Sequence, residues 1–137
     1  MELPPHRGKE MKYGLSKTTD LSFEQAMDKV TEELKKEGFG VLTSIDVKET
    51  LKNKLHVDFP RYTILGACNP PFAYQGLQSE EELGLLLPCN IIVFEKGGKV
   101  TVSIFDPMVI TKIVEKNEFV GIAQEMKTRL ERVIAAV

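Results

Sequence analysis

The sequence predicts an α+β fold with two layers, in which about five mainly antiparallel strands carry two long helices on one face. Three observations lead to this prediction. Apolar and polar residues alternate in several short segments, as they do in half-buried strands. Two longer segments, 22–38 and 117–137, repeat apolar residues at helical spacing. The double glycine at 97–98 separates two of the short segments and predicts a hairpin.

Length and composition indicate one globular domain. The chain has 137 residues, of which 42% are hydrophobic and 28% charged. A chain of this size can bury a core without support from metals or disulfides. Residues 1–10 are polar, contain two prolines and show no periodicity. We therefore expect a flexible N-terminal extension over 1–10 and a single α+β domain over 11–137.

The first part of the domain predicts a strand, a helix and a second strand. Residues 11–16 alternate between apolar side chains and polar or small ones, which is typical of a strand with one buried face. Ser22 and Gln25 have the spacing of a capping box, so we expect a helix to begin here and to end at Gly38. The alternation resumes in a strand over 39–45.

The middle of the chain predicts two short helices around a third strand. Asp46 can cap a charged helix with a weak apolar stripe that runs to about His56. The β-branched, aromatic and aliphatic residues at 62–67 predict the strand. Asn69 followed by proline is a typical helix start, which predicts a helix over 70–79.

The last part predicts a hairpin and the second long helix. A strand over 90–95 and a return strand over 100–104 flank the double glycine, and the long helix starts near Asn117. Residues 90–95 are apolar on both sides of the strand, so the face away from the long helices also needs cover. Either the short helices at 46–56 and 70–79 provide it or a second copy of the chain does, and we expect a homodimer.

Charge and hydropathy exclude several partners. The formal net charge is −2 and no basic patch stands out, so we expect no nucleic-acid partner. The N-terminus lacks the apolar core of a signal peptide, and no apolar run approaches the length of about 20 residues that crosses a bilayer. We therefore expect a cytoplasmic protein with no membrane partner. In that reducing compartment two cysteines are free thiols, a redox pair or ligands rather than a structural bridge.

The only two cysteines stand in similar settings, Gly-Ala-Cys-Asn-Pro-Pro at 66–71 and Leu-Leu-Pro-Cys-Asn at 86–90. If the strands that carry them are antiparallel, both thiols lie at the same edge of the sheet, whereas parallel strands would separate them. This repetition predicts a ligand-binding cleft formed by Cys68, Asn69, Pro70, Pro88, Cys89 and Asn90.

Each residue type in this cleft has a structural explanation beside a functional one. A thiol at a helix start, such as Cys68, is favoured as a reactive thiolate, but small buried cysteines beside turns are commoner. The asparagine amides either close turns or hold a polar ligand, and the turn is favoured. A structural zinc site needs four ligands, so His6, His56 or a second subunit would have to join the thiols, and we assign no metal. No catalytic triad is visible, and the cofactor is unknown.

Two function classes remain. The first is a homodimeric module that binds a small ligand near the two Cys-Asn segments. The alternative is a thiol-dependent redox or sulfur-handling protein in which Cys68 is the nucleophile and Cys89 the resolving thiol. Whether the protein is an enzyme stays open at this point.

The segments at 62–70 and 83–90, together with 40–48 and Asp106-Pro107, resemble the signature of the domain of unknown function 302 family. His56 stands where that pattern has a small residue such as glycine. The resemblance implies a small α+β domain that tends to dimerise, and it implies no activity.

Overall fold

The computed structural model describes residues 12–137, and the expected extension over 1–10 lies outside this range. A single five-stranded sheet has the order β1-β5-β4-β3-β2, and all four neighbouring pairs are antiparallel. The strands are β1 (Gly14–Thr19), β2 (Gly40–Asp46), β3 (Tyr62–Cys68), β4 (Cys89–Lys96) and β5 (Lys99–Phe105). The helices are α1 (Phe23–Lys36), α2 (Val47–Leu55), α3 (Pro70–Ser79), α4 (Ile110–Ile113) and α5 (Asn117–Ala136), with 3₁₀ turns η1 (Glu81–Leu86) and η2 (Pro107–Val109).

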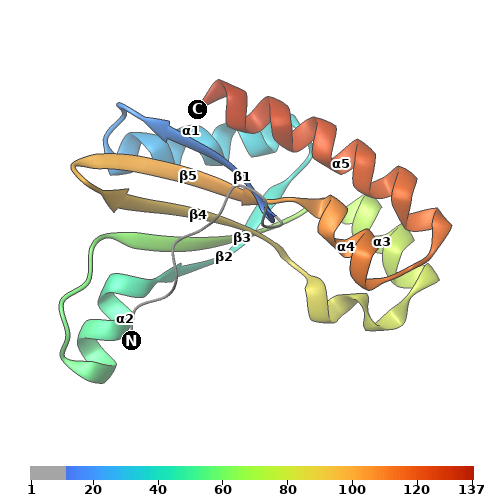
Figure 1. Ribbon diagram of the computed structural model, residues 1–137, viewed down its shortest axis with the longest axis horizontal. Helices are drawn as coiled ribbons and strands as arrows, with labels where there is room; N and C mark the ends of the chain where they lie inside the picture. The colour runs from blue at the N-terminus through green and yellow to red at the C-terminus, as the bar shows by residue number, and fades with distance from the viewer. Residues whose placement is uncertain (1–11) are drawn as a thin grey trace.

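The two long helices, α1 and α5, lie side by side on one face of the sheet (Figure 1). Their apolar stripes meet the inward side chains of the central strands. The main core contains Val30 and Leu34 from α1, Leu130 and Val133 from α5, and Ile91, Val93, Val102 and Ile104 from the sheet. The predicted α+β class, the strand number and the position of the long helices are therefore confirmed.

Local signals place α1 and the β4–β5 hairpin. Both capping-box hydrogen bonds of α1 are present: the Gln25 backbone N–H donates to Ser22 Oγ at 3.1 Å, and the Ser22 N–H donates to Gln25 Oε1 at 3.0 Å. Gly97 and Gly98 have φ angles of 60° and 77°, which glycine adopts without the steric penalty of other residues. Both elements match their predictions.

The first strand begins later than predicted. β1 starts at Gly14, and Met11 lies outside the described residues. Leu15 pairs with Ile104 of β5 and packs against the core, whereas Tyr13 is 66% exposed. Pairing with β5 sets the limits of this edge strand, and the apolar–polar alternation at 11–16 does not contain that information.

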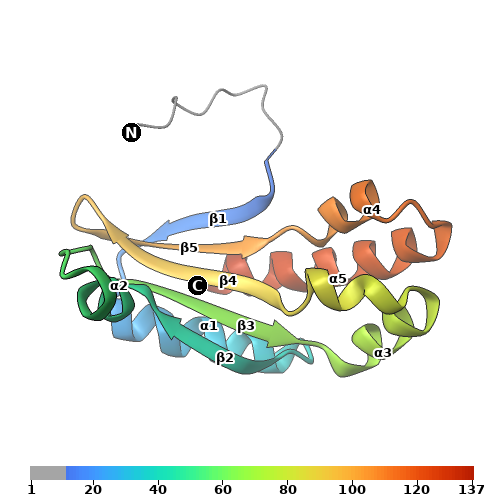
Figure 2. The ribbon, with the colours of Figure 1, turned by 90° about the horizontal axis from the view of Figure 1, so that it is seen from below.

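The other face of the sheet is left open by the helices. We call it the open sheet face, and its half-exposed or exposed apolar residues are Ile45, Tyr62, Ile64, Ile92 and Phe94. α2 buries none of its residues, and α3 lies beyond the end of the sheet (Figure 2). The sequence left two possible covers for this face, the short helices or a second copy of the chain. The short helices do not cover it.

Candidate functional site

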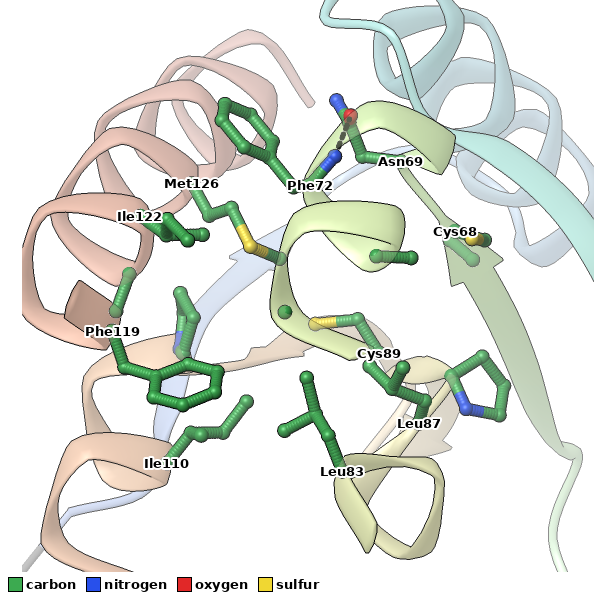
Figure 3. A pocket seen from close by; sticks show the side chains of 16 residues that line it. Cys68, Asn69, Phe72, Leu83, Leu87, Cys89, Ile110, Phe119, Ile122 and Met126 are labelled. Atoms are coloured by element: carbon green, nitrogen blue, oxygen red, sulfur yellow. Dashed lines mark hydrogen bonds between the residues drawn. The ribbon is translucent and has the colours of Figure 1, made fainter. Parts of the chain in front are cut away.

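A cavity of about 40 Å³ lies at the end of the sheet, where α3, η1 and the first half of α5 meet the ends of β3 and β4 (Figure 3). Its walls are almost entirely apolar. Phe72, Ala73 and Gly76 come from α3, Leu83 from η1, Ile110 from α4, and Phe119, Ile122, Ala123 and Met126 from α5. Four of the six residues predicted for the cleft also line it: Cys68, Asn69, Pro88 and Cys89.

Cys89 contributes a buried, protonated thiol to this wall. Its side chain is 4% exposed, and Sγ donates a weak hydrogen bond to the carbonyl oxygen of Phe105 at 3.8 Å. Burial, with smaller effects from the charges of Asp106 and Cys68, raises the pKa of Cys89 from its ordinary value of 9.0 to about 12. The thiol therefore stays neutral at physiological pH and is a poor nucleophile.

The two cysteines share an end of the sheet but do not face each other. β3 and β4 are antiparallel, as the shared-edge prediction required, yet the residue opposite Cys89 is Ala67. Successive residues of a strand point to opposite faces, so Cys68 is directed to the other side of β3. In Figure 3 the two sulfur atoms point apart, and both thiols are free.

The two asparagines have different surroundings. Asn69 is 5% exposed and caps α3, because its Oδ1 accepts a hydrogen bond from the Phe72 N–H at 3.4 Å. Asn90 is exposed on the open sheet face opposite Gly66, outside the cavity. Pro70 is an exposed residue at the start of α3 and also lies outside the lining. Asn69 therefore has the structural role that the sequence favoured, with its amide bound to the backbone. Asn90 lacks this role, although its neighbours in the sequence resemble those of Asn69.

Charged groups near the cavity are already paired. Lys127 forms an ion pair with Asp106 at 3.0 Å. Arg129 pairs with Glu125 at 3.1 Å, donates to the Glu37 carbonyl oxygen at 3.0 Å, and lies 5.1 Å from the centre of the Phe72 ring. The walls themselves contain no charged side chain. The site therefore has the chemistry of a small apolar pocket with paired charges around it.

Sequence reasoning did not place in the site the five lining residues that come from α5 and η1: Leu83, Phe119, Ile122, Ala123 and Met126. Phe119, Ala123 and Met126 belong to the apolar stripe of the long helix that the sequence predicts over 117–137 on one face of the sheet. Two of them, Phe119 and Ala123, are buried as that assignment requires. The length of α5 could have indicated these residues, because a helix of 20 residues is longer than the strands it covers and extends past the sheet.

The described residues offer neither a metal centre nor a membrane span. Between residues 12 and 137 no three or more His, Cys, Asp or Glu side chains gather closely enough to hold a metal ion. His56 is exposed at the end of α2, and His6 precedes the described range. No helix in the same range combines the length and apolarity that crossing a bilayer requires.

Comparison with known proteins gives a family and a fold. The family model described as "Domain of unknown function DUF302" matches residues 15–137. The crystal structure of an uncharacterised conserved DUF302 protein from Bacillus stearothermophilus is similar, with a TM-score of 0.85 and 26% identity over 92% of this chain and 98% of that one. No curated protein sequence matches. The chain therefore belongs to the DUF302 family of domains of unknown function.

Proposed function

We propose that this protein is a homodimeric module that binds a small ligand in the cavity beside Cys68, Asn69, Pro88 and Cys89. The observation that carries the proposal is the cavity itself. Protein interiors are packed with few voids larger than a water molecule, and about 40 Å³ exceeds the space that one ordered water needs. Apolar walls with one buried polar side chain are the usual composition of a ligand site.

Xenon tests whether the cavity accepts an occupant. Under xenon pressure we expect shifts in the methyl resonances of Met126, Ala123 and Leu83, because an apolar atom fits an apolar void. Ala73→Leu fills the same space from α3 and should abolish these shifts. Ala136→Leu makes the same change at an exposed position of α5 and should leave them intact. A wild-type protein without shifts would refute the ligand proposal.

The homodimer is supported by the open sheet face. The Phe59 ring lies 6.1 Å from that of Tyr62, and Tyr62 stacks on Phe94 at 5.4 Å. Leu55 at the end of α2 and Val57 and Phe59 in the segment that follows it are exposed as well. Apolar side chains that are accessible together on one face of a sheet indicate an interaction site.

The surroundings of this surface favour a second copy as its partner. α2, its N-cap and the segment after it carry both signs of charge, on Lys48, Lys52, Lys54, Asp46, Glu49 and Asp58. A border of mixed charge suits a two-fold interface, in which each surface meets itself. Residues 1–10 offer only Met1 and Leu3 as large apolar side chains, too few to replace a partner.

Sedimentation velocity tests the dimer. We expect the wild type to sediment with twice the chain mass of 15.4 kDa. Ile45→Glu places a charge at a 49% exposed position on the open sheet face and should yield monomers. Leu85→Glu is the matched control, because Leu85 is 84% exposed on η1, away from this face. A monomeric wild type would exclude the dimer.

The alternative function, thiol redox chemistry between Cys68 and Cys89, has less support. A resolving thiol must reach its partner as a thiolate, and the raised pKa and burial of Cys89 oppose this. We also propose a cytoplasmic location, a reducing compartment that is compatible with two unpaired cysteines directed to opposite faces of the sheet.

A further inference from the structure

We propose that the ligand of this cavity is a small neutral molecule that enters with a short apolar chain. The inference rests on the proposed ligand-binding function and adds the chemical class of the ligand. Three features of the walls carry it: their lack of charge, the paired state of the ions around them, and the engagement of their few polar groups.

The walls give a charged group no partner. None of the lining side chains is charged, and the polar one, Asn69, already uses its amide oxygen to cap α3. Moving an ion from water into such surroundings without a partner is strongly unfavourable. A charged end of a ligand would therefore have to stay outside the cavity.

The cations outside offer little to an anionic ligand. Lys127 lies 3.0 Å from Asp106, whose other carboxylate oxygen accepts from the Met108 N–H at 2.9 Å. Arg129 divides its donors between Glu125 and the Glu37 carbonyl oxygen. Each cation therefore already has a carboxylate beside it, Asp106 at Lys127 and Glu125 at Arg129. An anionic ligand placed there would also meet the negative charge of that carboxylate, so it gains less than it would beside an unpaired cation.

The thiol of Cys89 strengthens the same conclusion. Its proton is engaged with the Phe105 carbonyl oxygen, and the raised pKa keeps the sulfur neutral. The Met126 thioether also lines the cavity (Figure 3). The walls therefore contain two uncharged, polarisable sulfur atoms, which can pack against an aliphatic chain. The volume of about 40 Å³ limits the buried part of the ligand to a few heavy atoms.

A series with one chain and three head groups tests the charge of the ligand. At pH 7, 1-butanol, butanoate and butylammonium are titrated into isotopically labelled protein while the methyl resonances of Met126 and Ala123 are followed. We expect 1-butanol to shift both resonances in a saturable way and the two ions to bind at least about tenfold more weakly. Ala73→Leu should remove the 1-butanol response, and Ala136→Leu should retain it.

The outcomes separate this inference from the function on which it rests. If either ion binds as tightly as 1-butanol at these residues, the cavity is a ligand site but the neutral class is wrong. If xenon shifts the methyl resonances while 1-butanol does not, the cavity accepts an occupant and the proposed ligand class fails. If neither xenon nor any member of the series produces a response, the ligand-binding function falls as well.

Discussion

Asn69 and Asn90 look alike in the sequence, and their substitution should separate them. Asn69→Ala removes the Oδ1 acceptor that lies 3.4 Å from the Phe72 N–H and leaves the first turn of α3 without its cap. Loss of such a cap costs about 1 kcal/mol, and the length of this hydrogen bond argues against a larger value. Asn90→Ala changes an exposed side chain and should stay within about 0.5 kcal/mol of the wild type.

Urea denaturation measures both variants, with stability taken from the midpoint and the slope of each transition. The Asn69→Ala loss corresponds to a decrease in Tm of roughly 4 °C for a domain of this size. Asn69→Ser keeps a capping oxygen and should recover most of the stability. Equal effects at Asn69 and Asn90, or a silent Asn69→Ala, would refute the assignment of Asn69 as the cap.

Three further predictions concern single backbone or side-chain features. The unfolded chain ionises Cys89 near pH 9.0, whereas the folded chain holds its proton to about pH 12. Between these values the free energy of unfolding of the wild type should therefore fall as the pH rises. Its slope should be steeper than that of Cys89→Ala by about 1 kcal/mol per pH unit. His56 has a φ angle of 56° at the end of α2, so His56→Gly should stabilise the protein by about 0.5 kcal/mol in urea denaturation. A Cβ on Gly66 would lie 2.7 Å from Cγ of Pro88, so Gly66→Ala should lower the denaturation midpoint by the equivalent of about 1–3 kcal/mol.

The elements predicted well are those whose signals are local. The capping box of α1 and the double glycine of the β4–β5 hairpin each specify a structure within a few residues. The start of β1 depends on pairing with β5, which is remote in the sequence. In the Leu-rich segment at 83–87, η1 buries Leu83 while it exposes Leu85, a difference that the run of leucines does not indicate. Tertiary packing, rather than periodicity, decides such segments.

Four residues of the repeated segments, Cys68, Asn69, Pro88 and Cys89, line the cavity, but the repeated letters do not mark equivalent positions. They suggested equivalent roles, but the first pair precedes a helix and the second opens a strand. Asn69 therefore turns inward as a cap. Alternation along β4 sends Asn90 to the face opposite Cys89. The same two residue types thus stand in different backbone conformations, and the backbone conformation determines which side chains lie close together.

The cavity itself follows from a difference in length between the two layers. The 20 residues of α5 span about 30 Å, whereas the 7 residues of β5 span about 23 Å, so one end of the helix extends past the sheet. Phe119 and Met126 belong to the N-terminal half of the helix, whose apolar stripe still needs cover there. α3, η1 and α4 supply it, but several short elements with separate connections pack less completely than one sheet. The apolar stripe of α5 lines the space that these elements leave, which explains why the walls of the cavity are apolar.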